Sequence, residues 1–207
     1  MSSDLRDRRS VRGDATKELI LEAARESLRE QGYSATSIRA VAERAGVQLS
    51  LVHYHFGSKL AMLVAVLEHE NAKLLERQQA LFARPEPLSA KWRAACRFLE
   101  DDLESGYVRI LWELWAAGLA DEQLAARWRD ATAGWRRLMA EVFEEWSREM
   151  ELELPISAAA VATLVANLFQ GLEVEILAGV SEAEAPHLEV LEAVAKLIEG
   201  VESRASR

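Results

Sequence analysis

Apolar residues recur every three or four positions along most of this chain, with charged residues between them, as amphipathic helices require. No segment alternates apolar and polar residues in the manner of a strand, and no internal repeat interrupts the pattern. Helices are predicted over about residues 16–31, 37–45, 48–56, 58–82, 89–105, 108–118, 121–151, 157–177 and 184–201. The predicted fold class is therefore all-α.

The two short helices predicted over residues 37–45 and 48–56 are the most informative part of this pattern. The first has apolar residues at helical spacing and is broken by Gly46, while the second has its inward stripe at Val52 and Phe56. A short helix braced by another across a glycine-containing turn is the helix-turn-helix arrangement, whose second helix can enter a DNA major groove.

Particular residues in and around this segment add to the geometric argument. They are Thr36-Ser37-Ile38-Arg39, Ala42, Ala45-Gly46-Val47, Tyr54-His55-Phe56 and Ser58-Lys59, preceded by a helix over residues 20–36. With these residues the segment resembles the DNA-binding motif of the tetracycline-repressor (TetR) family of transcription regulators. Two positions depart from the family pattern, because His53 stands where a tyrosine is usual and Leu60 where an acidic residue is common.

The resemblance implies a division of the chain into two domains. Residues 14–60 are expected to form a three-helix helix-turn-helix DNA-binding domain, and residues 61–207 a helical ligand-binding and dimerisation domain. Residues 1–13, which contain four arginines, are expected to form a flexible arm that either contacts DNA or remains a solvated tail. The implied function is that of a transcription regulator, most often a repressor, which binds a palindromic operator as a homodimer and responds to a small-molecule effector.

The predicted contacts with double-stranded DNA divide into positioning on the phosphates and readout of the bases. The positioning group contains Ser37, Arg39, Tyr54, His55 and Lys59, of which the last three follow from the resemblance. The readout group contains Gln48, Leu49, Ser50, Leu51 and His53. A glutamine amide can pair bidentately with adenine, and a leucine can contact the methyl group of thymine. The alternative is a surface helix of a protein–protein interaction module that no longer contacts DNA.

The charge distribution changes the meaning of the net charge of −9. Residues 1–60 contain ten Lys and Arg against eight Asp and Glu, whereas residues 61–207 contain fifteen against twenty-six. This asymmetry places any DNA contact in the N-terminal third and predicts that the acidic remainder faces away from the phosphates.

Six tryptophans between positions 92 and 146 indicate either a large aromatic core or an aromatic-lined effector pocket between helices. The residues predicted to contact an effector are Trp92, Cys96, Trp112, Trp115 and Trp135. A rival interpretation is a helical enzyme that binds magnesium through Asp101, Asp102 and Glu104, but no second ligand cluster or nucleophile motif accompanies them. We predict no catalytic residue, no cofactor and no metal site, since His53 and His55 would point apart on a helix.

The last two predicted helices carry longer apolar stripes than a peripheral helix pair needs, which favours a two-fold four-helix interface. The residues predicted to form it are Leu164, Leu168, Phe169, Leu172, Leu191, Val194 and Ile198. The alternative is that they form the core of a monomer.

Cellular location follows from three negative observations. The single cysteine excludes an internal disulfide framework, the polar first twelve residues do not resemble a signal peptide, and charges interrupt the apolar stretches before the length of a membrane span. The sequence therefore predicts a soluble cytoplasmic protein with no membrane partner.

Overall fold

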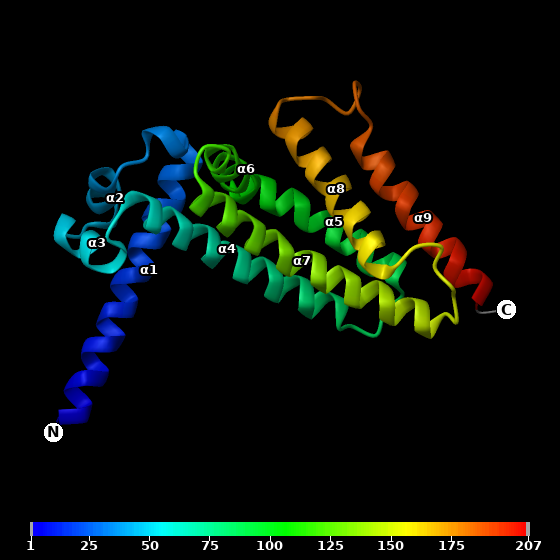
Figure 1. Ribbon diagram of the computed structural model, residues 1–207, viewed down its shortest axis with the longest axis horizontal. Helices are drawn as coiled ribbons and strands as arrows, with labels where there is room; N and C mark the ends of the chain where they lie inside the picture. The colour runs from blue at the N-terminus through cyan, green and yellow to red at the C-terminus, as the bar shows by residue number, and fades with distance from the viewer. Residues whose placement is uncertain (1, 206–207) are drawn as a thin grey trace. The chain divides into compact units, whose positions relative to one another are not determined.

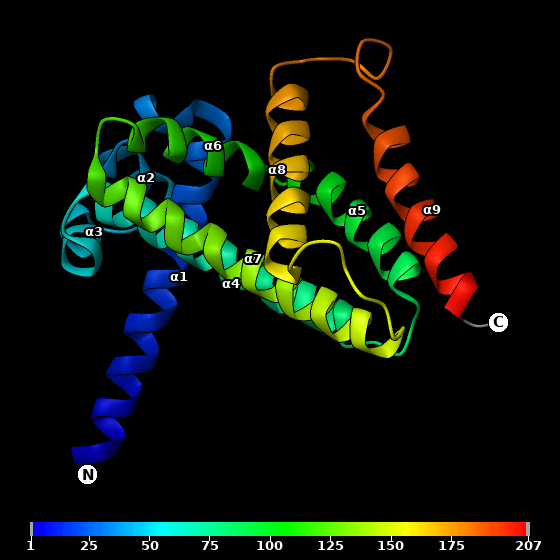
Figure 2. The same cartoon turned by 45° about the vertical axis from the view of Figure 1, so that its right-hand side comes forward.

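The computed structural model describes the backbone of residues 2–205 and, from Gly13 onward, their side chains (Figures 1 and 2). These residues form nine helices and contain no strand, which confirms the all-α fold class for the described part of the chain. The helices are α1 (Ser2–Ala35), α2 (Ile38–Ala45), α3 (Leu49–Phe56), α4 (Lys59–Phe82), α5 (Leu88–Glu104), α6 (Tyr107–Gly118), α7 (Glu122–Glu149), α8 (Ala158–Leu177) and α9 (His187–Ala205).

Helix α1 differs most from its predicted bounds, because it begins at Ser2 and not near Thr16. Its regular geometry is interrupted at Gly32, whose φ of 76° and ψ of 174° lie outside the helical region. A positive φ of this size is readily adopted by glycine alone, since it has no Cβ. The side chains of the arm predicted over residues 1–13 lie outside the described residues up to position 12, so the flexible arm stays a prediction.

The chain divides into two compact units. Unit 1 contains Met1–Asn71 and Arg109–Arg127, and unit 2 contains Ala72–Val108 and Trp128–Arg207. Helices α4, α6 and α7 therefore each contribute residues to both units. The boundary at residues 71 and 72 falls eleven residues later than the one predicted at 60 and 61, and the second segment of unit 1 was not foreseen.

Unit 1 is built around the contacts of α1 with α2 and α3, which lie beside it in Figure 1. Aliphatic side chains from each helix meet in its interior. The fully buried ones are Ile20, Leu28, Val41, Val52, Met62, Leu63, Val66, Leu67, Ile110 and Leu114. The short helices α2 and α3 have only three buried residues between them, so contacts with α1 stabilise them more than their own length does.

Unit 2 depends on the pairing of α5 with α9, which run side by side in Figure 2. Arg93 on α5 pairs with Glu192 and Glu199 on α9 at N–O distances of 2.9 and 2.8 Å. At the start of α5, the backbone N–H and the hydroxyl of Ser89 both donate to the carboxylate of Glu202. A carboxylate from α9 thereby satisfies a backbone amide that the first turn of α5 would leave without a partner.

Within the described residues, α8 is the one helix long and apolar enough to cross a membrane by length and composition, and α3 with α4 passes the same test as a pair bent by 68°. Core helices of soluble proteins also pass this test. Only 22% of the apolar window of α8 is buried inside the single chain, so much of its apolar surface is uncovered.

Candidate nucleic-acid interface

Helix α2 is fixed at both ends by its own sequence. Of the two hydroxyl residues that could cap it, Ser37 is the N-cap, and its Oγ accepts a hydrogen bond of 3.2 Å from the N–H of Ala40. Thr36 is buried, and its hydroxyl donates instead to the carbonyl oxygen of Gly32 at 2.8 Å. At the other end Gly46 adopts the left-handed conformation, with φ of 66°, and its N–H bonds back to the last turn.

Helix α3 has one fully buried residue, Val52, and exposes most of its remaining surface. Three of the exposed residues are large and apolar: Leu49 is 44% exposed, Leu51 38% and Tyr54 81%. Leu51 and Tyr54, three positions apart, lie on the same side of the helix, whereas Leu49 points away from Leu51. Apolar side chains left open to water on a short helix are characteristic of an interaction surface. Gln48, Ser50 and His53 are exposed beside them, so all five residues of the predicted readout group lie on open surface.

The amide of Gln48 is available for recognition. Gln48 occupies the N-cap position of α3, but its side chain makes no capping hydrogen bond. The ring of His53 is engaged more locally, since its Nδ1 lies 3.2 Å from the carbonyl oxygen of Gly57. Tyr54 and His55 stack edge to face with their ring centres 5.1 Å apart.

Arg39 is the most accessible cation of α2. Its guanidinium forms an ion pair with Glu43 one turn later at 3.2 Å, and the two side chains are 83% and 70% exposed. Surface pairs of this kind are worth little, because both charges are well solvated. The pair therefore leaves Arg39 able to exchange Glu43 for a phosphate oxygen.

Lys59, in contrast, already has protein partners. Its ammonium donates to the carbonyl oxygens of Tyr33 at 2.7 Å and Ser34 at 3.4 Å, and it lies 4.8 Å from the centre of the Tyr33 ring. Burial lowers the pKa of Lys59. Its predicted contact with a DNA phosphate stays a prediction beside this intramolecular role, which the sequence did not indicate.

The residues predicted to contact an effector divide between the two units. Trp112 and Trp115, on the α6 segment of unit 1, stack edge to face at 5.4 Å. In unit 2, Trp92 and Trp135 lie against Phe169, with ring centres 5.6 and 5.8 Å from it. Trp92 is only 2% exposed.

Cys96 and the acidic cluster on α5 have specific environments. Burial, followed by the charge of Glu192, raises the pKa of the Cys96 thiol to about 12, so the thiol stays protonated at neutral pH. Asp102 accepts a 2.6 Å hydrogen bond from Arg77 and forms an ion pair with it. In the described part of the chain, no three or more His, Cys, Asp or Glu side chains lie together so that they could hold a metal ion.

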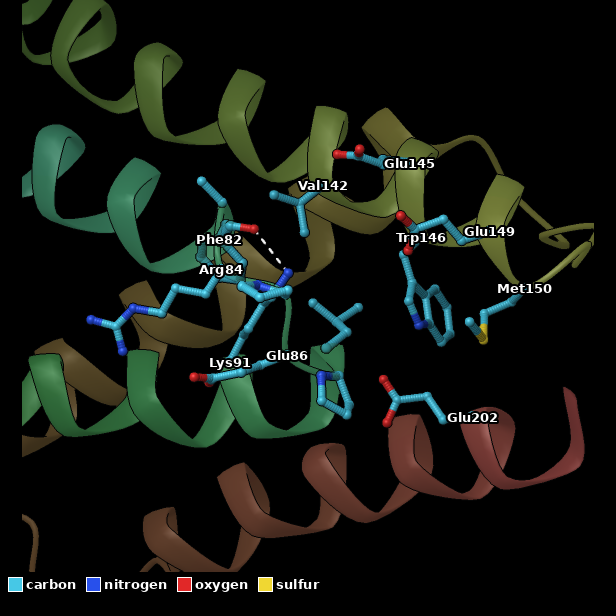
Figure 3. A pocket seen from close by; sticks show the side chains of 14 residues that line it. Phe82, Arg84, Glu86, Lys91, Val142, Glu145, Trp146, Glu149, Met150 and Glu202 are labelled. Carbon is cyan, nitrogen blue, oxygen red and sulfur yellow. Dashed lines mark hydrogen bonds between the residues drawn. The ribbon is translucent and has the colours of Figure 1, made fainter. Parts of the chain in front are cut away.

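A cavity of about 410 Å³ lies in unit 2 between the α4–α5 linker, the end of α7 and Glu202 of α9 (Figure 3). The indole of Trp146 and the carboxylate of Glu202 point toward it, and Lys91 closes one side by donating to the carbonyl oxygen of Phe82 at 2.9 Å. The Trp146 Nε1 is buried without a hydrogen-bond acceptor among the described residues. Sequence reasoning missed this cavity, although the Pro85 and Pro87 break marks the linker that borders it.

Known proteins resemble this chain in sequence and in fold. The transcriptional regulator UidR of Escherichia coli K12 is 23% identical over 82% of the chain and 86% of its own length. The transcriptional repressor Rv3405c of Mycobacterium tuberculosis is 47% identical over 55 residues, which are 27% of this chain and 29% of that protein. A transcriptional regulator of Saccharomonospora viridis, solved in complex with choline, has a TM-score of 0.70 at 19% identity and covers 90% of this chain and 95% of its own.

The exposed helix α3, braced by α2 across the Gly46 turn, defines a helix-turn-helix DNA-binding protein. Residues 20–66, which include both helices, match the model of the family described as bacterial regulatory proteins, tetR family. This helix-turn-helix segment belongs to the tetR family, and the relatives that resemble the chain are transcription regulators. The family recognised from residues 36–59 is therefore confirmed.

Proposed function

We propose that this protein is a repressor that binds a palindromic operator as a homodimer and releases it when a small molecule binds. The observation that carries the DNA-reading part is the exposed surface of α3, on which Leu49, Leu51 and Tyr54 are uncovered along with polar residues near them in the sequence. Removing such apolar surface from water on binding is favourable, and a helix of this width fits the DNA major groove. The likeness to the M. tuberculosis repressor over 55 residues supports the repressor role.

Substitutions in the predicted positioning group and in the predicted readout group should affect DNA binding differently. Losing a phosphate contact weakens binding to all sequences and lowers the salt dependence, whereas losing a base contact relaxes the preference at one position. Selection of bound duplexes from random DNA at a stated salt concentration, followed by binding measurements, separates the two. We expect selected sites with two-fold symmetry.

Arg39→Ala tests the positioning group, and Arg148→Ala is its matched control. Arg148 belongs to unit 2, pairs with Glu144 one turn earlier, and has a comparable side-chain exposure of 71%. We expect Arg39→Ala to weaken binding to every duplex and to make the salt slope shallower by about one. Equal effects of the two substitutions would remove Arg39 from the DNA interface.

Gln48→Ala tests the readout group. We expect it to lose discrimination at one base pair of the selected site, by about 1–3 kcal/mol, while binding to unrelated duplexes stays the same. A uniform loss on all duplexes would instead assign Gln48 to positioning. Failure to select any duplex would favour the alternative in which the helix-turn-helix binds a protein partner.

The homodimer part of the proposal rests on α8 and α9. Leu164, from the predicted interface, is 61% exposed, and further apolar residues of the two helices are open: Val174, Leu177, Leu188, Val190 and Leu197. Leu172, Leu191 and Ile198 are buried within the single chain and so lie beneath this surface. A second copy of the chain is the occupant we propose, because two heads on a two-fold axis match the two half-sites of a palindrome.

The effector part of the proposal places a small molecule in the domain that follows the DNA-binding head. The S. viridis relative that binds choline supports it, as do the aromatic cluster of Trp92, Trp135 and Phe169 and the cavity at Trp146. We infer a cytoplasmic location, where a regulator meets both DNA and metabolites. Release of the selected duplex on titration with choline and other small molecules tests the response. Unchanged affinity at saturating concentrations of every compound bound by unit 2 would contradict it.

A further inference from the structure

The segment Gly32–Ser34 connects the regular part of α1 to the helix-turn-helix. Part of its backbone geometry is fixed by residues close to it in the sequence. Gly32 turns the backbone out of α1 with its φ of 76°. Its carbonyl oxygen then accepts bonds from the N–H of Thr36 at 3.2 Å and the hydroxyl of Thr36 at 2.8 Å. These bonds fix the path from Gly32 to the start of α2, but they leave the N–H and C=O of Tyr33 for partners from elsewhere.

The N–H of Tyr33 has its partner on α6, in the second segment of unit 1. It donates to Oε2 of Glu113, a residue eighty positions later in the chain. The other oxygen of Glu113 accepts from Arg109 at 3.2 Å, which orients the carboxylate from behind. Hydrogen bonds to an ionised acceptor are stronger than neutral ones, so this contact holds the turn firmly.

The close approach of Glu113 depends on the absence of a side chain at Gly32. A Cβ added to Gly32 would lie 2.9 Å from Oε1 and 3.0 Å from Oε2 of Glu113. The carboxylate therefore fills the space that any other residue at this position would need. Glycine is therefore needed at position 32 for two reasons: it adopts the positive φ of the turn, and it leaves room for the carboxylate of Glu113.

The C=O of Tyr33 has its partner on α4, through the ammonium of Lys59 at 2.7 Å. The backbone N–H and C=O of Tyr33 are thus bound by side chains of opposite charge, Glu113 from α6 and Lys59 from α4. Both helices, α4 and α6, also contribute residues to unit 2. Glu113 and Lys59 therefore connect the turn to α6 and α4.

We propose that Glu113 is a positioning residue for DNA binding. By holding the N–H of Tyr33, it fixes the direction in which the chain leaves α1 and enters α2, and hence the orientation in which α3 is presented to the major groove. It contacts no DNA itself. The proposal goes beyond recognition by α2 and α3, because it assigns part of the DNA affinity to a residue outside the helix-turn-helix.

A simple charge argument predicts the opposite effect, which makes the proposal testable. Glu113 is negative, so its removal should strengthen binding to a polyanion if its charge were its only influence. We expect Glu113→Ala to weaken binding to the duplex recovered by selection by about five- to tenfold, because a turn that loses a charge-assisted bond samples other orientations. The salt slope should stay unchanged, since no phosphate contact is lost.

Two further variants distinguish the length of the Glu113 side chain from its charge, and both from a general effect of removing an acidic residue. Glu113→Asp keeps the charge but withdraws the carboxylate by one methylene, and we expect a loss of affinity close to that of Glu113→Ala. Glu18→Gln is the control, because Glu18 is an exposed acidic residue of α1 whose carboxylate lies 3.7 Å from the ring of His69, away from the Tyr33 turn contact. It should bind DNA as well as the wild type or better. Wild-type affinity in Glu113→Asp, or equal or tighter binding in Glu113→Ala, would overturn the proposal.

Amide hydrogen exchange gives a readout that does not depend on DNA. The N–H of Tyr33 should exchange about tenfold faster or more in Glu113→Asp than in the wild type, while buried amides of α1 such as that of Leu28 keep their protection. Unchanged protection at Tyr33 would overturn the proposal even if the affinity fell. This measurement also distinguishes failure of the turn contact from failure of DNA binding itself.

Discussion

The indole N–H of Trp92 donates a 2.9 Å hydrogen bond to the backbone carbonyl oxygen of Leu191 and so joins α5 to α9 inside unit 2. Leu191 is one of the buried apolar residues of α9. The Trp92 ring also packs against Phe169 of α8. Three helices are therefore tied at one buried aromatic residue. Any effector that contacts Trp92 must use the carbon atoms of its ring, because its one polar group already donates to Leu191.

Trp92→Phe should destabilise the protein by about 1–3 kcal/mol. The substitution removes the only donor that the side chain offers, and with it the buried hydrogen bond between α5 and α9, and it also reduces the aromatic volume. Urea unfolding followed by circular dichroism measures the change. Trp115→Phe is the comparison, since Trp115 is 37% exposed, and a loss as large as that of Trp92→Phe would show that the Leu191 bond is not the cause.

Ser37→Ala should cost about 1 kcal/mol of stability, because the Oγ of Ser37 caps α2 by accepting from Ala40. Thermal unfolding can be compared with Ser50→Ala, a change at an exposed serine in α3. We expect the second variant to unfold at the wild-type temperature. Equal midpoints for the two variants would contradict the capping role.

Leu197→Glu should convert the proposed dimer to monomers by placing a charge in the apolar surface of α8 and α9. Leu119→Glu provides a closely matched control, because Leu197 and Leu119 are both 72% exposed but Leu119 belongs to unit 1. Sedimentation velocity over a range of concentrations measures the outcome. A wild type that remains monomeric would contradict the proposed dimer. Two variants with the same mass would place the interface elsewhere.

The Cys96 thiol should react with iodoacetamide about a thousandfold more slowly in the folded protein than in the unfolded chain near pH 8. Its pKa is raised from 9.0 to about 12, chiefly by burial, so the reactive thiolate is correspondingly scarce. Alkylation followed by mass spectrometry, with and without urea, provides the test. Rapid alkylation of the folded protein would contradict the burial of this thiol.

The same raised pKa predicts a pH dependence of stability. Because the folded state favours the protonated thiol, its stabilising contribution is complete below the unfolded pKa of about 9 and is lost as the pH rises from 9 to about 12. Over this window the free energy of unfolding of the wild type should fall more steeply than that of Cys96→Ala. Parallel curves for the two proteins would remove Cys96 as the source.

Local features of the fold were predictable from the sequence because they depend on neighbours along the chain. The inward placement of Val52 and the break at Gly46 follow from helical spacing and from the conformational freedom of glycine. The choice between Thr36 and Ser37 as N-cap was not predictable, since both hydroxyls can cap a helix. It was decided by the carbonyl oxygen of Gly32, which engages Thr36.

Features that join distant residues gave no signal in the sequence. Glu113 is one of many acidic residues, and nothing in its neighbourhood indicates that it reaches Tyr33. Apolar spacing likewise selected Leu164 and Leu172 as equivalent, although the first is exposed and the second is buried. Periodicity identifies an apolar stripe, but it does not show which part of a broad stripe a neighbouring helix covers.

The discontinuity of unit 1 has a consequence for the order in which the chain is made. The helix-turn-helix is complete by residue 56, but the partner of the Tyr33 N–H is translated only at residue 113. A nascent chain that has emerged only as far as Asn71 therefore lacks one of the two charges that hold its turn. On the role proposed for Glu113, the nascent chain therefore reaches its full affinity for DNA only after more than half of it has been synthesised.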